Sequence, residues 1–431
     1  MKKIILFLLC LFLQTYVFAN QNVSLIDCEK AALNYSHNLK ALSNDYEASI
    51  SAAEAYKTMF YPSLMLEGSA KYIDEIPKLN AIKMGDNLNY SAGIAVYWTF
   101  FDAGVRSKNY ESLSNAALAQ KQQLLSEKNK LLLEVRITYF KTVGAFLVLK
   151  LLNEQLLVSI AQNNDIKSGL KYGTKTKIDE ALSDIDALNK TKQVKAAQIA
   201  LMENIMNLNY LTGGIIKEDI LKIVSENDGA QILNFDDSAN LLKDYQKFLR
   251  LSFDENSPQI LSFDFLSKAA QLLADAQSNE IFPLINISAK TSFDYPNGAA
   301  IETINQNTAA ISMSAPIYQF SKSQKLSRQN NLRAQSYIFT KEEIIAELKK
   351  LFEFSKQKTT YLLEQRSLNA DIISRAKTAA ELMYKSYLSG NARFLEVDAL
   401  NVMVMQAQAD EINTDIEILI QLAIIRSLSK N

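Results

Sequence analysis

The strongest constraint on the fold is a pair of long runs without proline, at residues 103–171 and 321–388. The first run contains glycine only at Gly104, Gly144 and Gly169. Good helix formers fill it, and apolar residues recur at intervals of three and four. This pattern predicts a single α-helix, which at 1.5 Å per residue would be roughly 100 Å long. No ordinary globular domain needs such a helix, and the second run of similar length indicates an elongated protein built twice.

Composition agrees with a folded, mainly helical chain. Of the 431 residues 48% are hydrophobic, and only 12 are glycine and 6 proline. The net charge is −1 and no polybasic stretch occurs, which argues against a nucleic-acid partner. The sequence has no phosphate loop, dinucleotide fingerprint or zinc motif, and His37 is its only histidine. We therefore expect no catalysis, no cofactor and no metal.

Residues 1–19 have the pattern of a secretory signal peptide. Two lysines precede an apolar core, and Val17-Phe18-Ala19 resembles a cleavage site. An uncleaved anchor is the alternative, although the core is short for a membrane span. Cleavage would leave Cys28 as the only cysteine, which excludes an intrachain disulfide. No later segment has 18 continuous apolar residues, so we expect any further membrane contact to be made by strands.

Two segments change from the helical period to strict alternation, and each predicts a β-hairpin, at residues 63–101 and 284–318. Between Tyr90 and Phe100 every second residue is apolar, and the residues between, apart from Tyr97, are polar or small. Each strand has about ten residues, the length that a tilted strand needs to cross a bilayer. Soluble hairpins packed on a core are the alternative. Aromatic residues stand at the predicted strand ends, as in an interfacial girdle: Tyr61, Tyr90, Trp98, Phe101, Phe282 and Tyr318.

The order of elements is the same in both halves of the chain, which predicts two structural repeats, 20–213 and 256–431, joined by a polar connector, 214–255. In each repeat a helix, a hairpin and a long helix precede a return helix. The predicted helices are 24–36, 39–59, 103–171 and 179–211 in the first repeat, and 256–280, 321–388 and 396–427 in the second.

The two turns between long and return helices share a pattern. Gly173 and Gly390 supply a left-handed cap, as helix C-termini commonly require. Six residues after each glycine comes an acid, Asp179 or Glu396. Either acid would lie in the first turn of the return helix, where the helix dipole favours negative charge.

This layout resembles the TolC-like outer-membrane factors, the exit ducts of tripartite efflux pumps and type I secretion systems. The resemblance rests on the proline that closes the helix before each hairpin (Tyr61-Pro62 and Phe282-Pro283), on the strand-to-helix junctions and on the two turns. It implies a mainly α fold with a small β part. Long antiparallel helical hairpins would form an α-barrel, and four strands per chain would contribute to a trimeric 12-stranded transmembrane β-barrel. Four strands alone cannot close a barrel, and lipid does not tolerate open sheet edges.

The resemblance also implies a function and its partners. The chain would be a passive, gated duct in the outer membrane that extends into the periplasm. It would form a homotrimer and work with a periplasmic adaptor protein and an inner-membrane pump. Both drug efflux and protein secretion fit. The alternative is a periplasm-spanning or surface coiled-coil structural protein without channel activity.

Site residues carry over at the periplasmic turns. Glu396 matches one acidic-ring position of the family's constriction, where a three-fold ring would favour cations. The position three later, often acidic in the family, is Ala399, and the neighbouring Asp398 would point elsewhere, so a single ring is expected. Asp179 and Tyr387 match positions that link the turns in the closed state, and simple dipole capping is the alternative for both acids. Contacts with the adaptor are expected around Gly173, Lys175, Gly390 and Arg393.

Overall fold

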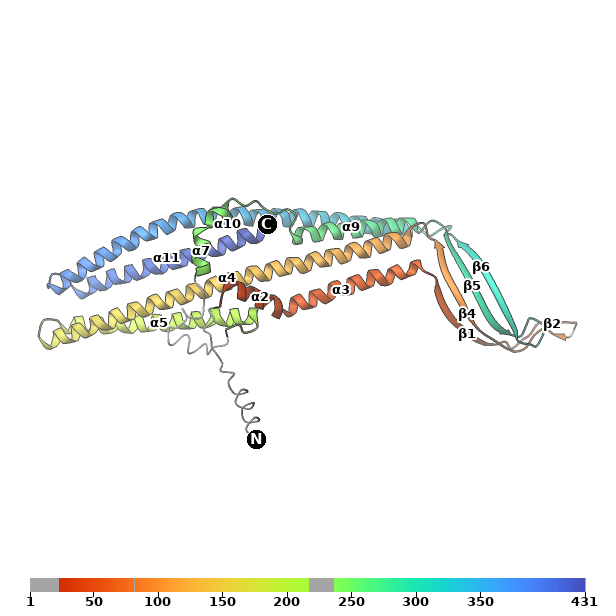
Figure 1. Cartoon of the computed structure of the whole chain (residues 1–431), viewed down its shortest axis with the longest axis horizontal. Helices are drawn as coiled ribbons and strands as arrows, with labels where there is room; N and C mark the ends of the chain where they lie inside the picture. Colours follow the sequence, from red (N-terminus) through yellow and green to blue (C-terminus); the bar gives the residue numbers. More distant parts are fainter. Residues whose placement is uncertain (1–22, 81, 217–235, 431) are drawn as a thin grey trace, which may run out of the picture. The chain divides into compact units, whose positions relative to one another are not determined.

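The computed structural model describes residues 23–80, 82–216 and 236–430. The predicted signal peptide lies outside the described residues. The chain forms two compact units, and each contains segments from both halves of the sequence (Figure 1). Unit 1 contains the described residues of Met1–Leu39, Glu127–Asp254 and Glu347–Asn431, and unit 2 contains those of Lys40–Ser126 and Glu255–Ala346.

Both long runs are continuous helices, as predicted. They are α4 (Val105–Lys171) and α10 (Lys322–Leu388), each of 67 residues. One 18-residue window of α4 has a mean hydropathy of 1.6, which by length and composition would allow it to cross a membrane, and a third of that window is buried. A helix that packs in a protein core meets the same criterion, so the window alone does not indicate a span.

Unit 2 contains an antiparallel sheet in the order β1-β4-β5-β6. The strands are β1 (Ser63–Tyr72), β4 (Leu88–Phe101), β5 (Leu284–Tyr295) and β6 (Ile304–Ser314). Both predicted hairpins are present, and β4 pairs with β5, so the sheet joins the two halves of the sequence. A further small hairpin, β2 (Lys78–Leu79) with β3 (Ile82–Lys83), lies between β1 and β4, where the sequence predicted no strand.

Three further helical segments accompany the sheet: α3 (His37–Lys57), the 3-10 turn η1 (Thr58–Phe60) and α9 (Pro258–Asn279). Helix α9 packs through small side chains, which lets backbones approach closely. The Ser112 hydroxyl on α4 donates a hydrogen bond of 2.8 Å to the Ala269 carbonyl. The Ser267 hydroxyl on α9 donates one of 3.1 Å to the Ala334 carbonyl on α10. Buried small residues of α9 are Ser267, Ala269, Ala270, Ala274 and Ala276.

The described residues of unit 1 form the rest of α4 and α10 together with five shorter helices. These are α2 (Leu25–Tyr35), α5 (Lys177–Thr212), α7 (Asp236–Lys243), α8 (Tyr245–Leu249) and α11 (Phe394–Leu428). The return helices α5 and α11 begin two residues earlier than predicted and end one residue later. Helix α2 starts one residue later than predicted, after Ser24, whose hydroxyl accepts a hydrogen bond from the Asp27 amide.

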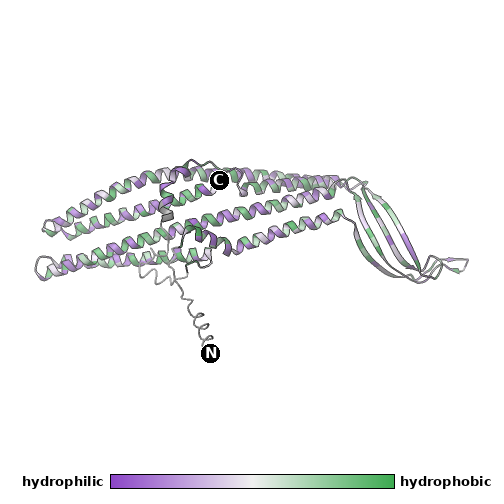
Figure 2. Ribbon diagram, viewed as in Figure 1, coloured by the Kyte–Doolittle hydropathy of each residue, from purple (hydrophilic) through white to green (hydrophobic). Residues whose placement is uncertain are grey.

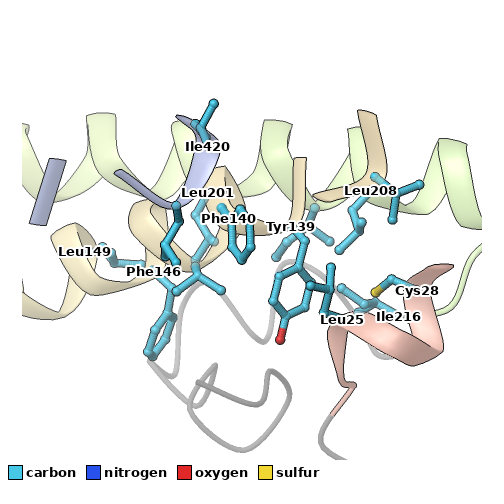
Figure 3. Close-up of a cluster of buried hydrophobic side chains, with 14 of the residues drawn as sticks. Leu25, Cys28, Tyr139, Phe140, Phe146, Leu149, Leu201, Leu208, Ile216 and Ile420 are labelled. Carbon is cyan, nitrogen blue, oxygen red and sulfur yellow. The ribbon is translucent and has the colours of Figure 1, made fainter. Parts of the chain in front are cut away.

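The core of unit 1 lies where α2, α4, α5 and α11 meet (Figure 3). The small helix α2 contributes Leu25 and Cys28 to this cluster, where Figure 3 shows Cys28 beside Ile216. Burial raises the pKa of the Cys28 thiol to about 12, so this cysteine is a neutral core residue. The labelled core side chains of the three longer helices are Tyr139, Phe140, Phe146, Leu149, Leu201, Leu208 and Ile420.

Candidate functional site

The sheet has the opposite polarity to that of a sheet in a water-soluble domain. Along β4 the apolar face from Leu88 to Val96 is exposed, whereas the small and polar residues between are half-buried or buried. Strand β5 repeats this pattern from Ala289 to Asp294. The outer strands also expose apolar side chains, and Leu66 of β1 is 85% exposed and Ile311 of β6 76%. Figure 2 shows apolar and polar residues interleaved along the strands.

The polar face is held by hydrogen bonds between strands. The Tyr97 hydroxyl donates to a Glu67 carboxylate oxygen at 2.5 Å, and the Lys290 ammonium lies 3.3 Å from the other oxygen. These contacts connect β1, β4 and β5. Further along the same face Ser91 and Ser292 both donate to Asp294. The polar groups named here therefore bond to one another, while no described residue of unit 2 covers the exposed apolar side chains of the other face.

The predicted aromatic residues lie at the two ends of the strands. Since Ser63 pairs with Tyr97 and Leu284 with Ser314, one end of the sheet carries most of them. Their side chains are largely exposed, although the Trp98 indole donates to the Phe60 carbonyl at 3.0 Å. At the other end Tyr90 stacks on Tyr295 with ring centres 4.7 Å apart. The end of the sheet at which β1 and β5 begin carries the other five: Tyr61, Trp98, Phe101, Phe282 and Tyr318.

The two helix turns in unit 1 have the same backbone geometry. Gly173 has a φ of 75° and Gly390 one of 78°, both in the left-handed region. The Gly173 amide donates to the Leu170 carbonyl, and the next amide reaches back to the Gly169 carbonyl. The Gly390 turn repeats both bonds, with identical lengths of 3.1 and 2.9 Å. This pair of backbone hydrogen bonds is the Schellman motif, for which glycine is the favoured residue.

Both acids of the turns cap their own helices. An Asp179 carboxylate oxygen accepts hydrogen bonds from the amide and hydroxyl of Thr176 at 3.1 and 2.7 Å. A Glu396 carboxylate oxygen accepts one from the Arg393 amide at 3.0 Å. Glu396 and Arg393 are exposed, so both side chains remain available to a partner. Capping and a second role in the assembled protein are compatible.

A cation–π contact links the two turns. The Lys175 ammonium lies 3.4 Å from the centre of the Tyr387 ring and 3.5 Å from the Tyr387 carbonyl oxygen. Tyr387 is buried beside Phe394, with ring centres 6.0 Å apart, in a cluster that includes Ile166 and Val397. The contact therefore joins the turn after α4 to the apolar base of the turn after α10. The sequence predicted Lys175 as a contact of the adaptor and gave no sign that it lies against Tyr387.

Asp179 acts on Tyr387 through its charge. Among the described residues the buried Tyr387 hydroxyl has no hydrogen-bond partner. Burial, the Asp179 charge and Tyr384 together raise the pKa of Tyr387 to about 12, so the ring stays neutral. The predicted link between Asp179 and Tyr387 remains a prediction for the assembled protein. Within the ranges that the structure describes, no group of three or more His, Cys, Asp and Glu side chains is placed to hold a metal ion.

Comparison with known proteins supports the fold. No family model matches this sequence, and no curated protein does. Solved structures match over almost the whole chain. The channel protein CusC has a TM-score of 0.79 at 16% identity, covering 95% of this chain and 93% of CusC. A membrane protein from Pseudomonas aeruginosa has a TM-score of 0.80 at 15% identity, covering 96% and 93% of the two chains.

A third solved structure is the outer membrane protein VceC from Vibrio cholerae. Its TM-score is 0.76 at 13% identity, covering 94% of this chain and 95% of VceC. Identities this low are evidence about the fold alone. The fold of this chain is therefore that of the TolC-like outer-membrane channels.

Proposed function

We propose that this chain is the subunit of a homotrimeric outer-membrane exit duct for efflux. The observation that carries the proposal is the polarity of the sheet, with its apolar face exposed and its polar face joined by hydrogen bonds. Transmembrane barrels have this arrangement, since their outer surface faces lipid and their interior faces water. A strand of 10 to 14 residues, tilted by about 45°, rises by about 24–34 Å, which matches the hydrocarbon thickness of a membrane.

The edges of the sheet support a trimer. In the sheet order β1-β4-β5-β6, one side of β1 and one side of β6 have no strand of the described chain beside them. Unpaired backbone groups cost several kcal/mol each in lipid, so the sheet must close. Three copies would supply 12 strands, and the polar face with Glu67 and Lys290 would line the lumen.

The helix turns would form the periplasmic gate. Glu396 from three copies would form an acidic ring, while Lys175 and Tyr387 would hold the two turns of each copy together. The exposed turn residues around Gly173 and Arg393 would meet a periplasmic adaptor, and an inner-membrane pump would supply the energy. The solved structures of channels with this fold support the general proposal, in particular the outer membrane channel CmeC from Campylobacter jejuni.

The first test is biochemical. The protein, purified from membranes in detergent, is expected to migrate as a trimer on gels without heating and as a monomer after boiling. In planar bilayers it should produce discrete conductance steps. Release from membranes by alkali or salt, with neither trimer nor conductance, would instead favour the alternative, a coiled-coil structural protein with soluble hairpins.

The second test concerns partners. Photo-crosslinkers placed at Thr174 and Arg393, both exposed, should capture a periplasmic adaptor in cells. One placed at Leu66, on the apolar face of the sheet, should not. Mass spectrometry of the captured complex would identify the accompanying pump and so separate drug efflux from protein secretion. Capture from Leu66 equal to the capture from the turn positions would contradict the proposed contact between the turns and the adaptor.

A further inference from the structure

Helices α5 and α11 are in contact with each other, and two acids, one from each helix, meet at this contact. The carboxyl group of Asp398 on α11 is hydrogen-bonded to that of Asp186 on α5. From α4 the Ser159 hydroxyl donates a hydrogen bond of 2.6 Å to the Asp186 Oδ2 atom. Two carboxylates in contact repel each other, and one shared proton converts the repulsion into a hydrogen bond.

A buried lysine lies beside these two acids. The Lys190 side chain is only 4% exposed, and its ammonium lies 4.0 Å from the Asp186 Oδ1 atom and 3.5 Å from the Met405 sulfur. The three groups are neutral together when the acids share a proton, and carry one negative charge when they do not. Because burying a net charge is costly, the interior favours the protonated pair.

The surrounding charges do not compensate for that cost. The groups that act on the Asp398 carboxyl are Asp186, which disfavours its ionisation, and Lys190, which favours it. No charged group of α4 or α10 among the described residues adds to these two. One layer away, Asp184 on α5 is paired with Lys167 on α4 at 2.7 Å, and this pair lowers the pKa of Asp184.

We propose that Asp186 and Asp398 form a proton-dependent latch, which holds α5 against α11 in mild acid and weakens as the pH rises to neutral. The latch joins the two helical hairpins of one chain, α4–α5 and α10–α11. It differs from the contacts of the turns themselves, since it lies inside the packed helices and depends on a shared proton.

The sign of the pH dependence follows from the two states of the contact. Burial and then Asp186 raise the pKa of Asp398 from 3.8 to about 6 while the helices are together. The contact is therefore fully favoured below pH 3.8 and loses stability as the pH rises through about 6. If the pKa returns to its ordinary value when the helices separate, local opening becomes about tenfold more frequent at pH 7.5 than at pH 5.

Amide hydrogen exchange on the full-length protein in detergent tests the latch directly. After correction for the intrinsic effect of pH on exchange, amides of residues 183–190 and 398–405 should be about tenfold less protected at pH 7.5 than at pH 5. Amides of the sheet in unit 2 provide the internal reference, because they should keep the same protection at both pH values.

Two variants and one matched control decide the outcome. Asp398→Asn removes the group whose pKa is raised, so the tenfold difference should disappear. Asp186→Asn removes the shared proton but leaves Asp398 in its half-buried place, so the difference should become smaller. Asp184→Asn removes an acid of the same helix whose pKa is lowered, so it should retain the difference. Equal protection of the wild-type protein at both pH values would overturn the proposal, as would a tenfold difference that persists in both pair variants.

The consequence for transport rests on the proposed function. If the turns gate a duct, its open probability in planar bilayers should rise from pH 5 to pH 7.5, and this rise should be absent in Asp398→Asn. The exchange experiment needs no channel activity. If the contact depends on pH but no conductance is seen, the latch is supported and the duct is contradicted. If conductance is seen but the contact does not depend on pH, the duct is supported and the latch is contradicted.

Discussion

The Lys175 ammonium lies 3.4 Å from the centre of the Tyr387 ring, so a cation joins two turns that are more than 200 residues apart in the sequence. A cation–π contact of this kind contributes about 1–2 kcal/mol when partly shielded from water. Lys175→Met should therefore make local opening of the turns about tenfold more frequent, measured by amide exchange of residues 383–394. Lys177→Met, at an exposed position of the neighbouring helix turn, is the matched control and should change little.

Tyr387→Phe separates the contribution of the Tyr387 ring from that of its hydroxyl group. Because no described residue accepts a hydrogen bond from that hydroxyl, removing it should leave the protection of the turns within about twofold of wild type. Tyr387→Ala should expose the turns, since it deletes a buried ring. If Tyr387→Phe opens the turns as much as Tyr387→Ala does, the hydroxyl forms a link between the turns in the assembled protein, as the family resemblance implies for Asp179 and Tyr387.

Gly173 and Gly390 should resist replacement by residues with a branched Cβ. Both have a left-handed backbone, although a Cβ would meet no atom within 4 Å. The cost of a valine is then backbone strain alone, about 1–2 kcal/mol at each turn. We expect Gly173→Val and Gly390→Val to lose export in a cell-based efflux assay while the trimer stays in the membrane. Gly173→Asn is the control, because asparagine tolerates this conformation. Normal export by both valine variants would contradict the role of the turns.

Glu396→Gln tests the proposed acidic ring. The substitution keeps the size and capping ability of the side chain but removes three charges from the trimer. The ratio of cation to anion permeability, obtained from reversal potentials in a salt gradient, should fall severalfold. Glu347→Gln, an exposed acid on α10 far from the turns, should leave the ratio close to wild type. An unchanged ratio in Glu396→Gln would place the constriction elsewhere.

Gly93 and Gly68, both in the sheet, allow a matched comparison of the same substitution. A Cβ on Gly93 would overlap the Thr291 carbonyl oxygen and lie 2.6 Å from the Ser292 Cβ, whereas a Cβ on Gly68 would meet nothing within 4 Å. Gly93→Ala should therefore destabilise the β4–β5 pairing by about 1–3 kcal/mol, whereas Gly68→Ala should be neutral or slightly stabilising. Thermal dissociation of the trimer on gels gives the comparison. Equal midpoints would show that the strands shift to accommodate the methyl group.

Local order could be predicted from the sequence because it depends on neighbouring residues. The absence of proline and the apolar spacing indicated α4 and α10, strict alternation indicated the four strands, and Gly173 and Gly390 marked the turns. These signals involve residues within a few positions of each other, where backbone propensity and side-chain period decide the conformation. The small hairpin from Lys78 to Lys83 was missed, because a two-residue strand is too short to show a period.

Contacts between distant residues were decided only by the tertiary structure. Strand β4 pairs with β5 across almost 200 positions, and the predicted strands alone do not specify this neighbour. Nothing in the local sequence of Lys175 points to the Tyr387 ring, and the expectation that Asp398 would point away from the constriction did not reveal that it meets Asp186. Which side chains meet follows from the packing of whole helices, so a charge that looks solvated in the sequence can become a buried partner when two hairpins close on each other.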